Sequence, residues 1–101
     1  MNPRQFQFEW DEIKAATNVR KHGVSFEMAA TVFYDPGMRT IPDVEHSDIE
    51  ERWFSVGLAS NRTLLSIAYI WQELPPMTTK IRLISARKAT QSEARYYEEN
   101  P

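Results

Sequence analysis

The sequence predicts an α+β domain in which the elements follow the order β-α-α-β-β-β-β-α and the helices pack on one side of a curled antiparallel sheet. Helical patterns occupy residues 11–34, and β-branched and aromatic residues dominate residues 52–87. The connections between the predicted strands are short, which favours antiparallel neighbours because parallel strands need long crossovers. A length of 101 residues suits a single domain, which we expect to span residues 1–101.

The first half of the chain is predicted to contain one strand and two helices. Residues 6–10 alternate apolar and polar side chains, which is typical of a strand. Asp11 can cap a helix that runs to about His22, and Gly23 stands where helices commonly end. A second helix is predicted from the cap Ser25 to the Asp-Pro-Gly turn that follows residue 34, with a core-facing stripe formed by Phe26, Ala29, Ala30 and Phe33.

The second half is predicted to contain four strands and a helix. A weak strand covers residues 38–41, and stronger strands cover residues 52–59, 63–72 and 80–87. The final helix opens with Thr90-Gln91-Ser92-Glu93, a capping-box pattern, and continues through about Glu99. The pattern therefore assigns Glu93 a structural role.

Composition and charge limit the class of protein. No stretch approaches the roughly 18 apolar residues of a membrane span, and the N-terminus has no secretory signal, so we expect no membrane contact. Cysteine is absent, which excludes disulfide scaffolds and thiol catalysis and fits a cytoplasmic protein. A pI near 5.7 argues against non-specific coating of nucleic acid and suits a chain held by a partner. Residues 51–101 nevertheless carry seven Lys and Arg against five Asp and Glu.

The first predicted helix carries a polar and basic stripe. Lys14, Asn18 and Lys21 stand at i, i+4 and i+7, and His22 follows. Such a stripe can contact RNA phosphates, with lysine as a point charge and asparagine as a neutral donor. An imidazole can donate or accept a proton at neutral pH, so His22 is a candidate general acid or base. The alternative is a solvated helix face that ends in a surface or capping histidine.

The segment 43–51 combines five acidic residues with His46, and it could in principle hold Mg²⁺ or Mn²⁺. It lacks EF-hand spacing and a glycine turn, so an ordinary acidic loop is favoured. The sequence contains no phosphate-binding glycine loop, HExxH helix or zinc-ligand spacing. We therefore expect neither a metal nor a cofactor.

Residues 80–88 form the most informative basic segment. In a regular strand Ile81, Leu83, Ser85 and Arg87 share one face, so Arg87 would lie beyond the apolar part of that face. Arg52 begins another strand, and two strand-end arginines could clamp a phosphodiester and stabilise the charge that develops on it. Arg82 and Lys88 are further candidate RNA contacts. The alternative is that these charges solubilise a sheet edge or pair with the acids of residues 43–51.

The final helix adds Tyr96 and Tyr97. One of them is expected in the core, and the other could stack on a base or offer its hydroxyl to a phosphate; the sequence leaves open which. Together these residues suit RNA cleavage, because the 2′-OH of the substrate supplies the nucleophile. The protein then needs to provide only a base, an acid and positive charge.

Two end motifs of the chain resemble BrnT-type toxins. The first is Phe8-Glu9-Trp10-Asp11 followed by Lys14, Asn18, residues 21–27 (Lys-His-Gly-Val-Ser-Phe-Glu) and Ala29. The second is Ile84-Ser85-Ala86-Arg87-Lys88-Ala89 followed by Glu93 and a tyrosine, and the resemblance runs from about residue 6 to residue 98.

This resemblance implies a metal-independent endoribonuclease toxin of a type II toxin–antitoxin pair, with a RelE-like fold, that inhibits translation and growth. It implies a BrnA-type antitoxin, DNA contact only through that antitoxin, and a homodimer or a toxin–antitoxin heterotetramer. We predict catalytic roles for Lys21, His22, Arg52, Arg87 and Tyr97, and RNA contacts for Lys14, Asn18, Arg82, Lys88 and Tyr96. The rival interpretation is an inactive RelE-fold module that only binds its antitoxin or nucleic acid.

Overall fold

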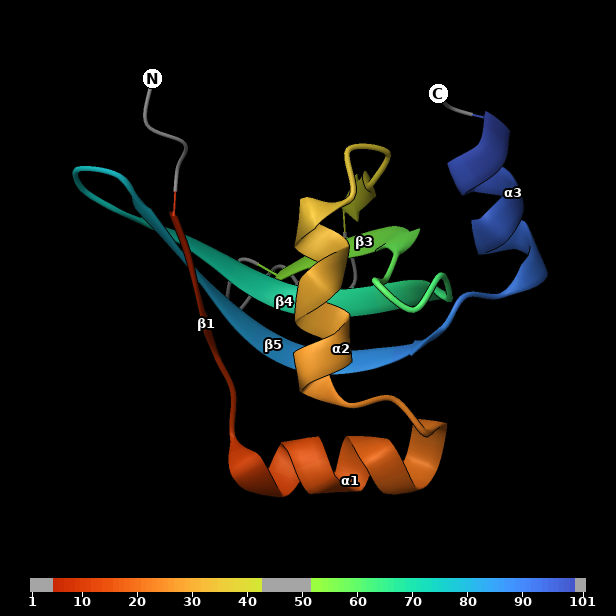
Figure 1. Ribbon diagram of the computed structural model, residues 1–101, viewed down its shortest axis with the longest axis horizontal. Coiled ribbons are helices and arrows are strands. Elements are labelled where there is room, and N and C mark those ends of the chain that lie inside the picture. The colour runs from red at the N-terminus through yellow and green to blue at the C-terminus, as the bar shows by residue number, and fades with distance from the viewer. Residues whose placement is uncertain (1–4, 43–51, 100–101) are drawn as a thin grey trace.

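A computed structural model describes residues 5–42 and 52–99 of the chain (Figure 1). The elements lie in the predicted order, which confirms the α+β class. They are β1 (Gln5–Glu9), α1 (Glu12–His22), α2 (Phe26–Ala30), the 3-10 helix η1 (Thr31–Tyr34), β2 (Arg39–Pro42), β3 (Arg52–Leu58), β4 (Leu64–Leu74), β5 (Thr78–Lys88) and α3 (Gln91–Glu99).

The helix α1 begins and ends where the sequence pattern places it, and α2 begins after its predicted cap; the second predicted helix is divided, because α2 ends at Ala30 and the 3-10 helix η1 continues to Tyr34. The Asp11 carboxylate accepts a hydrogen bond from the Lys14 amide at the start of α1, and Gly23 ends this helix with a φ of 70°, in the left-handed region that favours glycine. The Ser25 hydroxyl accepts from the Met28 amide at the start of α2. In the described ranges, no helix is long and apolar enough to cross a membrane.

The five strands form one sheet in the order β1-β5-β4-β3-β2. The pairs β2–β3, β3–β4 and β4–β5 are antiparallel, as predicted from their short connections. The pair β1–β5 is parallel, which corrects the expectation of a wholly antiparallel sheet. Short connections do not constrain the direction of this pair, because β1 and β5 are separated by most of the chain.

A β-bulge in β5 changes which face its side chains occupy. Ser85 pairs with Ala68 of β4, and Leu83 pairs with the next residue, Tyr69, so that Ile84 between them has no partner in β4. The extra residue reverses the alternation of side chains along the strand. Ile81 and Leu83 are buried and Ser85 is exposed. The prediction that Arg87 shares a face with Ile81 and Leu83 is therefore wrong, and Arg87 lies on the opposite face.

The two faces of the sheet carry different helices. The first, which we call the helix face, packs against α1, α2 and η1 in a core formed by Val24, Phe26, Ala29, Val32, Phe33, Leu65, Ile67, Tyr69, Ile81, Leu83 and Ala86. Ser66 and Arg87 alternate with these core residues and both bond Glu93 of α3. The helix α3 thus lies on the other face, which we call the α3 face. This corrects the expectation that all helices pack on one side.

Candidate functional site

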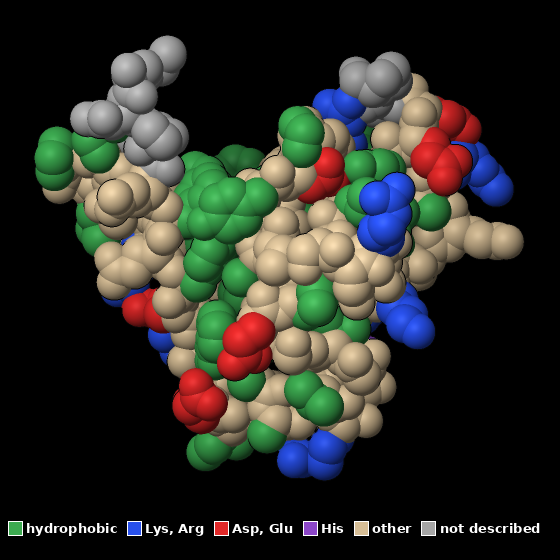
Figure 2. Space-filling view, in the orientation of Figure 1, with side chains coloured by type: hydrophobic (Ala, Val, Ile, Leu, Met, Phe, Trp, Pro, Cys, Tyr) green, Lys and Arg blue, Asp and Glu red, His purple; other side chains and the backbone are tan. Residues whose placement is uncertain are grey.

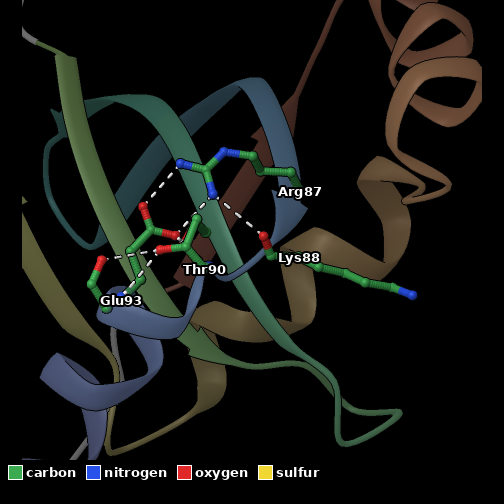
Figure 3. Close-up of polar contacts among 6 residues, drawn as sticks. Arg87, Lys88, Thr90 and Glu93 are labelled. Atoms are coloured by element: carbon green, nitrogen blue, oxygen red, sulfur yellow. Dashed lines mark hydrogen bonds and ion pairs between the residues drawn. The ribbon is translucent and has the colours of Figure 1, made fainter.

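Arg87 is held by a carboxylate of its own chain (Figure 3). Its two terminal nitrogens lie 2.8 and 2.9 Å from the two carboxylate oxygens of Glu93. Oε1 of Glu93 also accepts from the Ser66 hydroxyl at 2.7 Å and from the Thr90 amide at 2.9 Å. The Glu93 amide in turn donates to the Thr90 hydroxyl at 3.2 Å. This bond and the bond from the Thr90 amide to the Glu93 carboxylate confirm the predicted capping box. Arg87 therefore ties α3 to the sheet.

The electrostatics of this pair keep both partners charged. The hydrogen bonds from Arg87 are the main reason that the pKa of Glu93 falls to about 2, and burial opposes them only in part. The same bonds raise the pKa of Arg87. A phosphate that binds Arg87 would compete with the Glu93 carboxylate, because Glu93 already accepts an N–H from each terminal nitrogen of the guanidinium.

This pair predicts an acid-dependent loss of stability. A carboxyl group with a lowered pKa stabilises the folded state above its unfolded pKa of about 4.5, and this contribution disappears as the pH falls towards about 2. The free energy of unfolding of the wild type should therefore exceed that of Glu93→Gln at pH 7, and the difference should shrink between pH 4.5 and pH 2. Urea titrations at several pH values measure it. A difference that stays constant across this window would contradict the assignment.

Arg52 and Arg87 do not meet in a clamp. Arg87 of β5 pairs with Ser66 of β4, which pairs with Val56 of β3. Arg52 lies four residues before Val56 on β3 and pairs with Ile70 of β4. The two arginines are thus two strands and four residues apart, roughly 10 Å across the sheet and roughly 13 Å along it. Because Glu93 also holds Arg87 towards α3, the predicted clamp on one phosphodiester is not formed.

The basic residues beside Arg52 on the α3 face form ion pairs. Arg82, next to Ile70 in register, lies 3.0 Å from one oxygen of Glu9, and Lys80 lies 3.2 Å from the other. The hydrogen bond from Arg82 is the main reason that the pKa of Glu9 is lowered. These pairs connect the edge strand β1 to β5, so Arg82 has a structural function beside the predicted contact with RNA.

Asn18 does not share a solvent-facing stripe with its lysine neighbours. It is 5% exposed, and its amide nitrogen donates to the carbonyls of Val24 at 2.9 Å and Ala86 at 2.7 Å. Its oxygen accepts from the Ala86 amide at 3.1 Å. Lys14 and Lys21 are exposed. Asn18 therefore fixes α1 to β5, and we remove it from the proposed RNA contacts.

The two tyrosines of α3 have different environments. The Tyr97 hydroxyl donates to Asp35 at 2.8 Å, which raises the pKa of Tyr97, whereas Tyr96 is 40% exposed. Burial would raise the pKa of Asp35, but hydrogen bonds from the amides of Leu58 and Gly37 and from Tyr97 outweigh it and lower the pKa. Tyr97 therefore holds α3 against the turn after η1.

Sequence reasoning missed Asp35 and Arg39. Asp35 was interpreted only as a helix stop, although an aspartate before Pro-Gly is a known Asx-turn signal, and its carboxylate does accept from the Gly37 amide at 2.9 Å. Arg39 stands beside Val56 on the α3 face, and its Nε is buried without a hydrogen-bond partner among the described residues. No local pattern indicated this position.

One remaining candidate, Lys88, lies at a pocket of about 260 Å³ on the helix face, which we call the Lys88 pocket. Lys88 lines it, and so do Val19 and Gly23, the residues on either side of the segment 20–22 that contains Lys21 and His22. Residues of the β3–β4 turn, of the segment before α2, of α2 and of β4 complete the lining, namely Asn61, Thr63, Val24, Ser25, Met28 and Leu65. Lys88 points away from the Arg87–Glu93 pair (Figure 3).

The cations near this pocket differ from Arg82 and Arg87 in one respect. Within residues 5–42 and 52–99, Lys21, His22 and Lys88 form no ion pair, and all three are exposed. They stand at the same end of the sheet, where α1 ends and β5 ends (Figure 1). This end of the helix face can therefore accept an anionic ligand without first breaking an internal salt bridge.

Comparisons with known proteins agree with this fold. The sequence profile of the family described as "Ribonuclease toxin, BrnT, of type II toxin-antitoxin system" matches residues 10–93. The crystal structure of the Brucella abortus ribonuclease toxin, BrnT, is similar, with a TM-score of 0.58 and 21% sequence identity over 86% of this chain and 99% of that chain. No curated protein sequence matches this chain. At such identity the structural likeness shows the fold, and similarity to RelE toxins stays a prediction. The family profile covers most of the chain, which therefore belongs to the BrnT family of ribonuclease toxins of type II toxin–antitoxin systems.

Proposed function

We propose that this toxin is a metal-independent endoribonuclease that binds RNA at the Lys88 pocket and inhibits translation and growth by cleaving it. The observation that carries the proposal is the exposed Lys88 in the lining of this pocket, together with the exposed Lys21 and His22 at the end of α1, the helix whose residue Val19 also lines it. Within the described ranges these three residues form no ion pair. The description of the family as ribonuclease toxins supports the same activity.

The lining of the pocket suits a nucleotide. Val19, which is 47% exposed, offers an apolar surface to a base, and Asn61 offers amide groups for its polar edge. Lys88 offers a charge for the adjoining phosphate. A volume of about 260 Å³ gives room for one base.

The proposed reaction uses the ribose itself. The 2′-oxygen attacks the adjacent phosphorus while its proton passes to a base, and the bond to the 5′-oxygen breaks as that oxygen gains a proton. The products are a 2′,3′-cyclic phosphate and a 5′-hydroxyl. His22 transfers the protons, and Lys21 and Lys88 stabilise the negative charge that grows on the phosphoryl oxygens.

The other predicted residues take different parts in this proposal. Arg87 and Tyr97 act by holding α3 on the sheet, through Glu93 and Asp35. Lys14, Arg52 and Tyr96 remain candidate contacts for more distant parts of an RNA chain, whereas Arg82 acts in this proposal through its ion pair with Glu9. The metal-nuclease alternative rests on residues 43–51, which lie outside the residues that the structure describes.

One observation favours a second candidate function. Glu93 binds both terminal nitrogens of Arg87, so a phosphate at this arginine would compete with a carboxylate of the same chain. The second candidate is therefore an inactive member of the family that binds its antitoxin or nucleic acid without cleaving RNA. Type II membership implies an antitoxin in both cases. We propose a BrnA-type antitoxin that supplies any DNA binding of the complex.

Two matched lysine or arginine variants test where RNA binds. Lys88→Ala should lower the rate of cleavage of a labelled RNA about tenfold or more, because it removes a charge-assisted contact to phosphate. Arg82→Ala also removes one positive charge from β5, but it should leave the rate within about twofold. Equal losses in the two variants would indicate a general charge effect, and a loss confined to Arg82→Ala would move the site to the α3 face.

A further inference from the structure

The helix face carries a second depression, which is apolar and lies over the other half of the sheet. We call it the apolar groove; it has a volume of about 270 Å³ and is lined by Met38, Thr40, Trp53, Tyr69 and Trp71. Trp53 is 36% exposed in it. Figure 2 shows hydrophobic side chains gathered in a hollow on the side of the β4–β5 hairpin.

The polar atoms beneath this groove already have partners. The hydroxyl of Thr40 lies 3.1 Å from that of Ser55, which lies 2.7 Å from that of Tyr69. Burial raises the pKa of Tyr69, so its hydroxyl stays protonated as part of this chain of bonds. Edge-to-face contacts between aromatic rings hold two of the lining side chains in place. The ring centroids are 6.1 Å apart for Trp71 and Phe6, and 4.8 Å apart for Tyr69 and Phe33. The groove is therefore a preformed apolar surface.

The charges of the lining residues indicate a protein ligand. None of the five lining residues is Lys, Arg or His. RNA that stacked its bases on Trp53 and Trp71 would bring phosphates that none of these five residues neutralises, whereas recognition of single strands combines aromatic stacking with positive charge. Apolar protein side chains would fill the groove without such a cost, and exposed tryptophans of this kind commonly anchor protein interfaces.

We propose that the apolar groove receives apolar side chains of the antitoxin. The proposal rests on the toxin–antitoxin part of the function, and it does not depend on RNA cleavage. Family membership implies that the chain has such a partner. The ligand is an amphipathic segment whose apolar side chains contact Trp53 and Trp71 and whose polar side remains in water.

The groove and the Lys88 pocket are separate sites on one face. Leu65 of β4 lines the pocket, and Tyr69 and Trp71 of the same strand line the groove. These positions are four and six residues apart, about 13 to 20 Å along an extended strand. Loss of the groove should therefore weaken the antitoxin without changing the chemistry on RNA. A toxin with a damaged groove would escape its antitoxin and remain active.

The test measures antitoxin affinity and RNA cleavage on the same variants. The full-length chain is purified, and its dissociation constant for the small protein encoded by the adjacent gene is measured by calorimetry. Trp53→Glu should raise this constant tenfold or more, since it places a charge in the apolar groove. The control Ile13→Glu places the same charge on an apolar residue of α1 that is 77% exposed, and it should bind as the wild type does. Thr40→Arg at the rim gives a second groove variant should Trp53→Glu not fold.

Each outcome decides the proposal. Weaker binding by both groove variants, with RNA cleavage within about twofold of wild type, supports it. The proposal is overturned if Thr40→Arg and a folded Trp53→Glu both bind the antitoxin with the affinity of the wild type. It is also overturned if the wild-type chain does not bind the neighbouring protein. Loss of RNA cleavage with unchanged antitoxin affinity would assign the groove to RNA, and a change only in self-association would assign it to a second copy of the chain. If the wild type cleaves no RNA, the ribonuclease proposal fails while the affinity comparison still tests the groove.

Discussion

His22→Ala is expected to lower the rate of RNA cleavage by about 10²- to 10⁴-fold, the usual contribution of a general acid or base. His22 ends α1, is exposed and directly precedes Gly23, which lines the Lys88 pocket, so the proposal places its imidazole at the RNA ribose. In the proposed reaction it takes the proton of the 2′-OH or delivers one to the leaving 5′-oxygen. Its removal leaves the lysines to bind RNA but takes away the proton transfer.

The measurement is single-turnover cleavage of a labelled RNA, with circular dichroism to confirm that α1 is intact. Arg20→Ala is the matched control, since Arg20 is exposed in the same last turn of α1 and its guanidinium lies 3.2 Å from the Thr17 hydroxyl. This control should retain most of the rate. A folded His22→Ala protein that cleaves as fast as the wild type would exclude His22 from proton transfer.

Asn18→Ala is expected to lower the free energy of unfolding by about 3 kcal/mol, because it deletes three buried hydrogen bonds at once. The carbonyls of Val24 and Ala86 and the amide of Ala86 would lose their side-chain partner in a site where Asn18 itself is 5% exposed. A buried donor or acceptor that loses its partner lowers the free energy of unfolding by more than the hydrogen bond itself contributed to it. The contact between α1 and β5 should weaken most.

Urea denaturation of Asn18→Ala beside Lys14→Ala separates the two interpretations of the α1 residues. Lys14 is exposed on the same helix, so its replacement should change the free energy of unfolding by less than about 0.5 kcal/mol. Cleavage per folded molecule should be unchanged in Asn18→Ala. A stable Asn18→Ala protein with impaired RNA binding would restore Asn18 as an RNA contact.

The secondary structure was largely predictable because its signals are local. Asp11, Gly23 and Ser25 act at the ends of the helices as their types predict. Thr90 and Glu93 form the reciprocal bonds of a capping box. The bulge at Ile84 was not predictable, because the residue has strong strand propensity and nothing in its neighbours indicates an extra position. That single residue determines the face on which Arg87 lies.

The pairing of side chains was less predictable than the elements. Arg87 stands six residues before Glu93, and the capping role of Glu93 did not reveal that the same carboxylate also binds a guanidinium. The bonds of Asn18 to Ala86 join residues 68 positions apart. Such contacts depend on how α1 and α3 are placed on the sheet. The sequence identified which charged residues to consider, and the fold separated those held in ion pairs from those near the Lys88 pocket.

The most direct test of the central claim is cleavage of a labelled RNA by the purified chain in excess EDTA. The proposed reaction uses the 2′-OH of the substrate, the imidazole of His22 and the charges of Lys21 and Lys88, so it requires no metal. We predict wild-type cleavage in the chelator and none of an RNA whose ribose at the cleavage site lacks the 2′-OH. Activity that disappears in EDTA and returns with Mg²⁺ or Mn²⁺ would contradict the account and place the chemistry at the acidic residues 43–51.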